Sequence, residues 1–255
     1  MNTTEAPTTA KRIALITGAN RGLGFATAQL LGGAGFTVLV GSRNSESGER
    51  AAERLRGDGI DAHAVRIDVT SDASVKQAAI DVAAEHGGLD VLVNNAGILP
   101  EATTADIERP LDMAMFRASF ETNVFGAVSV IKEFLPLLRA AAAGRIVNVS
   151  STMGSLTDQS DPDSAYYGLV VPAYQTSKAA LNGLTIALAK TLSDTNVKVN
   201  SVCPGWVQTD LGGPDNRAAA PTTAEMAAEI VADMAMIDDG GPTGGFFDRA
   251  GIVAW

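Results

Sequence analysis

Strand-like and helix-like segments alternate along almost the whole chain, and this order restricts the fold more than any other feature. The strand-like segments are short and apolar throughout: 12–16, 37–40, 62–67, 89–93, 145–149 and 197–202. The segments between them have helical periodicity: 25–34, 46–56, 73–85, 111–138, 173–192 and 223–236. Continuous hydrophobicity is typical of parallel strands covered on both faces. The order therefore predicts an α/β Rossmann fold, a doubly wound parallel sheet flanked by helices on both faces, with ligands at the carboxyl ends of the strands.

Composition favours one globular domain. The chain has 255 residues, 46% of them hydrophobic, and contains neither an internal repeat nor a dividing linker. We expect a disordered lead at 1–10 (MNTTEAPTTA) and a single Rossmann-type oxidoreductase domain over 11–255. The net charge of −10 argues against a nucleic-acid partner. No apolar run has membrane-spanning length, the start lacks the apolar core of a signal peptide, and Cys203 is the only cysteine. These features predict a cytoplasmic protein.

A glycine-rich turn joins the first strand to the first helix. The turn reads TGANRGLG over residues 17–24, so Gly18, Gly22 and Gly24 have GxxxGxG spacing. Gly18 permits a tight turn, Gly22 allows a pyrophosphate to approach the backbone, and Gly24 allows close packing of the helix. The free N–H groups of the helix N-terminus favour phosphate. Strand, turn and helix in this order predict a dinucleotide-binding site.

A tyrosine and a lysine follow in the segment VPAYQTSKAALNGL. Tyr174 and Lys178 are spaced YxxxK, so one face of a helix would carry both side chains. A cation near a phenol favours its anionic form, which makes the tyrosine a usable proton donor and acceptor. The spacing alone also fits an ordinary solvated helix face.

These motifs together resemble the short-chain dehydrogenase/reductase family, whose cofactor motif is TGxxxGxG and whose catalytic pair is YxxxK. Further matches occur in the family's order: Asp68, the NNAG of 94–97, Asn123, Ser150-Ser151 and Pro204-Gly205. The resemblance covers residues 11–255. Within the family, TGANRGLG, VNVSS, CPGWVQTD and GPTGGFF are most similar to the carbonyl-reductase branch.

The residues after the second strand predict the choice of cofactor. A carboxylate there would hydrogen-bond the ribose hydroxyls, but this chain has Ser42-Arg43-Asn44 and no acid before Glu46. Arg43 can form a bidentate contact to a 2′-phosphate, while Arg21 would supply a second cation and Ser42 a hydroxyl. The pattern favours NADP(H) over NAD(H). A plain surface cation is the alternative interpretation of Arg43.

The resemblance implies a cofactor site at the carboxyl ends of the strands. Asp68 and Val69 would contact the adenine, with a turn or cap role as the alternative for Asp68, and Pro204-Gly205 would pass under the nicotinamide. The complete set of implied cofactor residues is Gly18, Asn20, Arg21, Gly22, Leu23, Gly24, Ser42, Arg43, Asp68, Val69, Asn95, Ala96, Gly97, Tyr174, Lys178, Pro204, Gly205, Val207 and Thr209.

The same resemblance implies the catalytic residues Asn123, Ser151, Tyr174 and Lys178. Ser151 would polarise a carbonyl and Tyr174 would protonate its oxygen. Lys178 would lower the phenol's pKa and bind the nicotinamide ribose, while Asn123 would distort its helix and hold a water of the proton relay. His63 and His86 have no metal-ligand spacing, so no metal site is expected.

Two connections near this site are expected to affect substrate access. Residues 152–173 form a longer connection than the family usually has, and we expect a structured loop that either shapes substrate choice or packs against the sheet or a neighbouring subunit. The glycine- and proline-containing stretch 210–221 is expected to be mobile without cofactor and to close over the bound cofactor, with an ordinary solvated loop as the alternative. The helix after the insertion commonly forms a subunit interface in the family, which leaves monomer and homo-oligomer both open.

Together these features predict an NADPH-dependent reductase of an aldehyde or ketone, or the reverse oxidation of an alcohol. Reduction of an activated C=C or C=N bond and a non-catalytic, NADP-sensing regulator remain alternatives. The physiological substrate, its stereochemistry and the physiological direction are not readable from the motifs, because loop conformations form the pocket walls.

Overall fold

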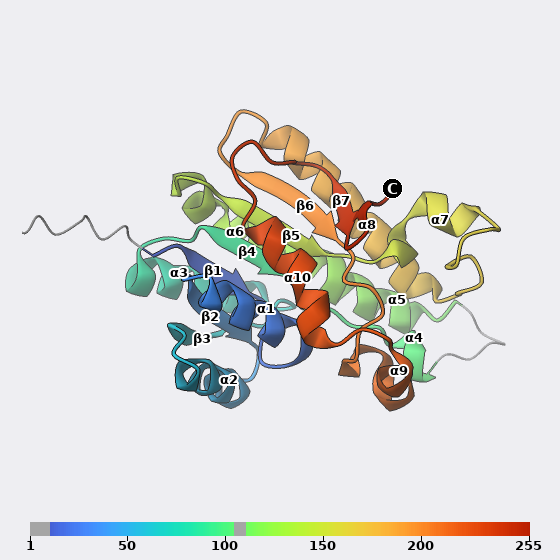
Figure 1. Cartoon of the computed structure of the whole chain (residues 1–255), viewed down its shortest axis with the longest axis horizontal. Helices are drawn as coiled ribbons and strands as arrows, with labels where there is room; N and C mark the ends of the chain where they lie inside the picture. The colour runs from blue at the N-terminus through green and yellow to red at the C-terminus, as the bar shows by residue number, and fades with distance from the viewer. Residues whose placement is uncertain (1–10, 105–110) are drawn as a thin grey trace, which may run out of the picture.

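The computed structural model describes residues 11–104 and 111–255, and these form a central eight-stranded sheet (Figure 1). The strand order is β3-β2-β1-β4-β5-β6-β7-β8, and only the β7–β8 pair is antiparallel within the described residues. The strands are β1 (Ile13–Ile16), β2 (Thr37–Ser42), β3 (Ala62–Arg66), β4 (Val91–Asn94), β5 (Arg145–Val149), β6 (Lys198–Val202), β7 (Phe246–Asp248) and β8 (Gly251–Ile252). The predicted doubly wound Rossmann fold is confirmed.

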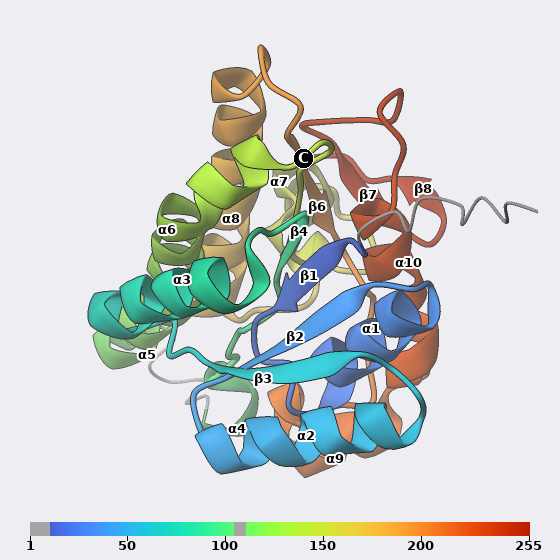
Figure 2. The same ribbon diagram turned by 90° about the vertical axis from the view of Figure 1, so that its left-hand side faces the viewer.

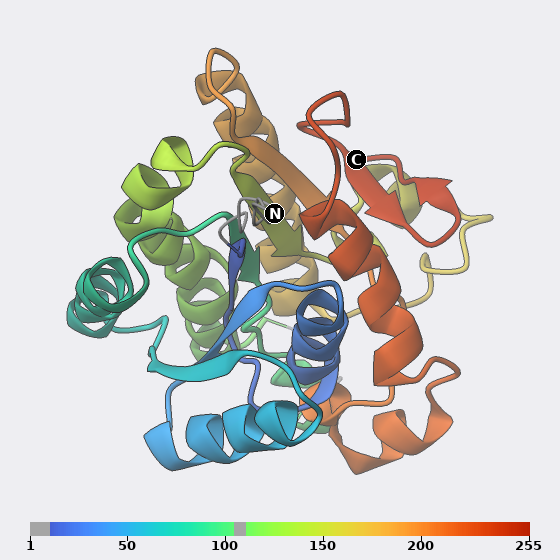
Figure 3. The same cartoon turned by 60° about the vertical axis from the view of Figure 1, so that its left-hand side comes forward.

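Helices cover both faces of the sheet (Figures 2 and 3). One apolar core lies between the sheet and α1, α2 and α10; the other lies between the opposite face and α3 and α6, with α8 packed at its border. The longer helices are α1 (Gly22–Gly33), α2 (Ser45–Gly57), α3 (Asp72–His86), α5 (Met113–Phe120), α6 (Gly126–Ala140), α8 (Pro172–Thr191) and α10 (Ala224–Ala235). The short ones are α4 (Glu101–Thr104), α7 (Leu156–Ser160) and α9 (Gly213–Ala219).

Each predicted strand and helix is present with somewhat different ends, and the structure adds two strands and the short helices α4, α7 and α9. β7 and β8 were not predicted because three and two residues are too few for a hydrophobic period to be visible. The predicted helix 111–138 is divided by a π-helical turn at Glu121–Phe125. The predicted lead 1–10 lies outside the described residues.

Both connections predicted to affect substrate access contain helix. The insertion 152–173 includes a 3₁₀ turn at Thr152–Gly154, helix α7 and the first residues of α8, and no strand. The stretch 210–221 forms a 3₁₀ turn at Asp210–Gly212 followed by α9, so it is more regular than its glycines and prolines suggest. Its closure over a cofactor stays a prediction. No helix in the described ranges is long and apolar enough to cross a membrane.

Candidate active site and cofactor groove

Helix α8 carries the Tyr174–Lys178 pair on its buried side. Each of these two residues has a relative exposure of 5%. Lys178 Nζ donates a hydrogen bond of 2.8 Å to the carbonyl oxygen of Val149 at the end of β5, and it lies 5.5 Å from the centroid of the Tyr174 ring. The lysine therefore joins the helix to the carboxyl end of the sheet, and the solvated-face interpretation of the YxxxK spacing is wrong.

Burial shifts the pKa values of both groups in the direction that favours the neutral form. Desolvation raises the pKa of Tyr174 well above its ordinary value, Cys203 raises it further, and a hydrogen bond with the Ser151 side chain lowers it. Desolvation lowers the pKa of Lys178 to about 8. Burial dominates the pKa of the phenol in this structure, and the Lys178 amine is directed at the Val149 carbonyl, so the lowering expected from Lys178 stays a prediction.

The two serines that follow β5 have different surroundings. Ser150 is buried, with its hydroxyl 3.5 Å from the backbone oxygen of Lys178. Ser151 is partly exposed, accepts a hydrogen bond from the Met153 N–H at 3.1 Å, and interacts through its side chain with Tyr174. Ser151 is thus the serine whose hydroxyl lies beside the candidate proton donor.

Asn123 lies in the π-helical turn, where the α-helical hydrogen-bond ladder is interrupted. Its side chain accepts from Ile98 N–H at 2.9 Å and donates to Ile98 C=O and to Ser177 Oγ, both at 3.0 Å. The expected local distortion of this helix is present, which is common for π-bulges near functional sites. Asn123 connects the loop after β4 to helix α8.

The glycine turn is held open by its neighbours. Gly22 has a φ of +57°, and the N-terminus of α1 has no side-chain cap. A Cβ atom on Gly24 would lie 2.8 Å from the Gly18 carbonyl oxygen, so only glycine fits there. Asn95 Nδ2 donates to the Thr17 carbonyl at 2.8 Å and braces the turn from β4. The uncapped N–H groups of α1 remain available to an anion.

Gly97 lies between the lysine and the asparagine of the candidate catalytic set. A Cβ atom there would lie 3.3 Å from Asn123 Oδ1 and 3.7 Å from Lys178 Nζ. The Ala96 N–H donates to Thr17 Oγ1 at 3.0 Å. The loop after β4 therefore passes from the glycine turn to Lys178, as a cofactor spanning both motifs would require.

The segment after β2 presents an arginine beside the N-terminus of α2. Arg43 is exposed and has no ion-pair partner among the residues that the structure describes. Asn20 lies at the same place, with its Nδ2 3.5 Å from Ser47 Oγ. The Ser42 hydroxyl is buried and donates to the Asn44 carbonyl at 2.9 Å, and its predicted contact with a 2′-phosphate stays a prediction.

Asp68 forms a turn at the end of β3. Its carboxylate accepts from the N–H and the hydroxyl of Thr70 at 3.0 and 2.8 Å, whereas Ser71 caps helix α3. The Asp68 carboxylate therefore stabilises a turn, as the alternative interpretation of this residue predicted. The neighbouring Val69 packs near Gly126. An adenine contact from Asp68 and Val69 stays a prediction.

The turn after β6 lies next to the glycine turn. Gly205 has a φ of +83°, and the Val207 backbone pairs with Thr222. A Cβ atom on Gly22 would lie 3.3 Å from the Thr209 methyl group, which shows how closely the two turns approach. Pro204 precedes this turn, and Trp206 within it is 52% exposed.

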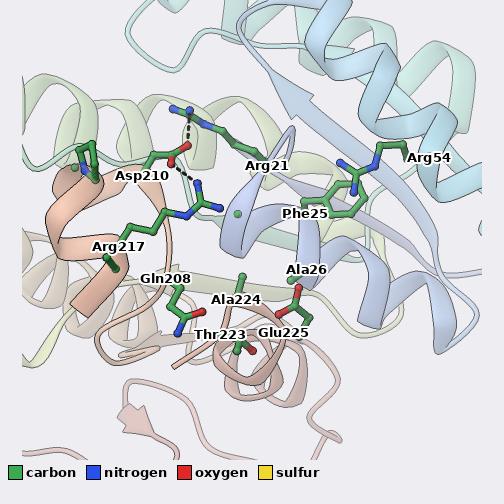
Figure 4. A pocket seen from close by; sticks show the side chains of 14 residues that line it. Arg21, Phe25, Ala26, Arg54, Gln208, Asp210, Arg217, Thr223, Ala224 and Glu225 are labelled. Atoms are coloured by element: carbon green, nitrogen blue, oxygen red, sulfur yellow. Dashed lines mark hydrogen bonds and ion pairs between the residues drawn. The ribbon is translucent and has the colours of Figure 1, made fainter. Parts of the chain in front are cut away.

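Arg21 is engaged in an ionic contact that the sequence did not reveal. Its guanidinium is 2.7 Å from Asp210, and the same carboxylate is 2.9 Å from Arg217 of α9 (Figure 4). Arg21 was expected to serve as a second cation for a 2′-phosphate, but in this structure its charge is paired with the segment after β6. A cavity of about 980 Å³ lies beside this contact, between α1, α9 and α10. Its lining contains none of the four candidate catalytic residues, so the candidate reaction centre lies outside this cavity.

Three contributors to the site were missed at the sequence level: Glu101, Ser177 and Asp210. Glu101 accepts a hydrogen bond from the Ala173 N–H, 72 residues away in the chain, and Asp210 contacts Arg21, 189 residues away. No local sequence pattern predicts pairs so far apart. Ser177 stands inside the YxxxK motif, and its distance from Tyr174 on the helix was the only available signal.

The sheet, the glycine turn and the buried tyrosine–lysine pair together define a Rossmann-type oxidoreductase domain. The family model described as short chain dehydrogenase matches residues 12–220. The chain belongs to this family of oxidoreductases.

Individual relatives fall in the same family. The chain is 39% identical to the short-chain dehydrogenase anuI of Penicillium roqueforti over 213 residues, which cover 80% of this chain and 81% of the relative. It is 30% identical to the mouse carbonyl reductase [NADPH] 1 over 281 residues, covering 95% and 98%. Among solved structures, NADPH-bound carbonyl reductase from chicken fatty liver has a TM-score of 0.80 at 27% identity and covers 97% of this chain and 100% of that chain. These similarities support the carbonyl-reductase-like branch.

Proposed function

We propose that this protein is an NADPH-dependent reductase of aldehydes or ketones, and that it also catalyses the reverse oxidation. The observation that carries the proposal is the burial of Tyr174 and Lys178 on one side of α8, with the Lys178 amine held at 2.8 Å by the Val149 carbonyl at the end of β5, two residues before Ser151. The similarity to carbonyl reductases that bind NADPH supports it.

The residues of the groove fit NADP(H). The glycine turn leaves backbone N–H groups free at the N-terminus of α1, which suits a pyrophosphate. Arg43 is exposed at the end of β2, where a 2′-phosphate would need a cation, and no carboxylate lies between β2 and Glu46 to repel that phosphate. Gly97, Lys178 and the turn at 204–209 would border the nicotinamide ribose. When bound, NADPH supplies the hydride.

The side chains would then handle the oxygen of the substrate. Ser151 donates a hydrogen bond that stabilises negative charge on this oxygen, and Tyr174 gives it a proton. A raised pKa keeps the phenol protonated at neutral pH, which suits the reductive direction. Lys178 is held by the Val149 carbonyl and would bind the ribose, while Asn123 fixes the loop and helix around it.

Other reactions remain possible on the same scaffold, and each has its own test. Reduction of an activated C=C or C=N bond would give a different product, identified by mass spectrometry. A cofactor-sensing regulator would have no use for Ser151, Tyr174 and Lys178 together, and it would bind NADPH without turnover.

A panel of aldehydes and ketones assayed by NADPH consumption tests the proposal. We expect at least one carbonyl to be reduced to its alcohol, with NADPH preferred over NADH. Tight NADPH binding without turnover of any carbonyl, imine or enone would instead favour the regulator.

A further inference from the structure

Helix α8 has no cap of its own at the end that carries Tyr174. Its N-cap residue is Val171, whose side chain cannot accept a hydrogen bond, and its first residue is Pro172, which has no N–H. The Val171 N–H is satisfied by Gln175 Oε1 at 3.1 Å. The N–H groups of Ala173 and Tyr174 are left without a local acceptor.

A carboxylate from a distant segment accepts from both of these groups. Glu101 Oε1 accepts from the Ala173 N–H at 2.9 Å, and Glu101 Oε2 accepts from the Tyr174 N–H at 2.8 Å. Exposure is 5% for Glu101, 0% for Ala173 and 5% for Tyr174, so water has little access to replace either bond. A carboxylate at a helix N-terminus is also favoured by the helix dipole.

The same segment holds the other side of the Tyr174 peptide. The Tyr174 carbonyl accepts from Ser177 Oγ at 2.7 Å, and this hydroxyl accepts from Asn123 Nδ2. Asn123 in turn is bonded to both backbone groups of Ile98. Residues 98 and 101 thus fix the tyrosine backbone at its N–H directly and at its C=O through Asn123 and Ser177.

We propose that Glu101 is a positioning residue for Tyr174: its carboxylate caps helix α8 from outside and sets the place of the proton-donating phenol. The inference rests on the proposed function, in which Tyr174 donates the proton. The loop from β4 begins at the glycine turn and reaches Glu101 past Gly97, so it joins the candidate cofactor groove to the donor helix.

The test compares two substitutions of Glu101 with one matched control. Glu101→Gln keeps the shape and one acceptor oxygen, and Glu101→Ala removes the cap. Glu53→Ala removes an exposed glutamate of α2 and controls for loss of a carboxylate as such. The measurements are kcat and KM for a carbonyl substrate, the Kd of NADPH by titration, thermal unfolding, and hydrogen exchange of the peptide covering 171–178 in the cofactor-free protein.

Misplacing a catalytic group by about 1 Å can reduce a rate by about a hundredfold. We therefore expect kcat to fall at least about tenfold in Glu101→Ala, only a few-fold in Glu101→Gln, and not at all in Glu53→Ala. The Kd of NADPH should stay within about twofold of wild type, because the Glu101 carboxylate contacts the N-terminus of α8 and not the candidate cofactor site. Exchange in the 171–178 peptide should be faster in Glu101→Ala.

Other outcomes would overturn the inference. Unchanged kcat with a lowered unfolding temperature would make Glu101 a structural cap only, and equal losses in kcat and NADPH affinity would assign it to the cofactor. Should Glu101→Ala not fold, a wild-type kcat in Glu101→Gln together with unchanged exchange would also reject it. Failure of the proposed function would look different: wild type itself would reduce no carbonyl, while the exchange measurement would still report on the cap.

Discussion

The two regions of the candidate site, one around Tyr174 and the other around the glycine turn at 17–24, differ in burial and in the kind of contact that holds them. Around Tyr174, the side chains of Asn123, Tyr174 and Lys178 are buried, and Asn123 and Lys178 are hydrogen-bonded to backbone groups of the loop after β4 and of β5. Around the glycine turn, the contact of Arg21 with Asp210 and Arg217 is an exposed ion pair: the Arg21 side chain is 70% exposed and that of Asp210 is 44% exposed. Proton transfer depends on fixed geometry, whereas recognition of a charged cofactor tolerates long side chains in solvent. Substitutions at the buried end should therefore have larger effects than those at the exposed end.

The largest effect is expected for Tyr174→Phe, which removes only the transferable proton. General acid catalysis commonly contributes about 10²–10⁴-fold, so kcat should fall at least about a hundredfold while NADPH binding is retained. Steady-state kinetics and an NADPH titration measure the two quantities. More than half of the wild-type rate remaining would show that another group protonates the product.

The pH dependence tests the buried lysine. Burial lowers the pKa of Lys178 to about 8, so its ammonium is present below this pH and is lost as the pH rises through it. An anionic cofactor favours the charged amine, so kcat/KM for NADPH should fall roughly tenfold between about pH 7 and pH 9. In Lys178→Met the value should be low and independent of pH over this range. A wild-type profile that is flat to pH 10 would contradict the assignment.

Arg43→Ala tests the exposed end through the cofactor's 2′-phosphate. A charge-assisted bidentate contact contributes about 1.5–3 kcal/mol, so the KM for NADPH should rise about tenfold or more. The KM for NADH should hardly change, because NADH lacks this phosphate. An equal loss with both cofactors, or a wild type that prefers NADH, would leave Arg43 as a surface cation.

The smallest effect is expected for Asp210→Asn, which breaks the exposed contact with Arg21 and Arg217. Exposed ion pairs contribute about 0–1 kcal/mol, so the unfolding temperature should move by less than about 4 °C. Release of Arg21 should lower the KM for NADPH by at most about fivefold, and high salt should remove the difference. A loss of activity comparable to that of Tyr174→Phe would mean that the two ends do not differ as described.

The agreement between sequence and fold follows from local rules. The apolar strands, the tight turn at Gly18 and the close packing at Gly24 were each predicted from short motifs, and the structure has them: Gly18 has a φ of +66°, and a Cβ atom on Gly24 would clash with the Gly18 carbonyl oxygen. The YxxxK spacing also fixed which two side chains share a helix face. Strands β7 and β8 were not predicted, because they are too short to show a hydrophobic period.

The surroundings of individual side chains could not be predicted from the neighbouring sequence. The sequence suggested that Lys178 would lower the pKa of Tyr174, but the tertiary structure buries the phenol and turns the amine toward Val149. It suggested that Arg21 would serve a phosphate, but folding brings Asp210 to it. Neither arrangement could be predicted locally, because burial and charge pairing depend on which distant segments meet, and both predicted roles stay predictions.

By itself, then, the sequence determined the order of strands and helices, the glycine turn and the residue types of the candidate catalytic set. The tertiary structure decided how the donor helix is held. Val171 and Pro172 leave its first N–H groups unsatisfied, and only the fold brings Glu101 to them across 72 residues of chain. A backbone donor buried from water must find an acceptor, and the chain supplied one from the loop that also braces the glycine turn.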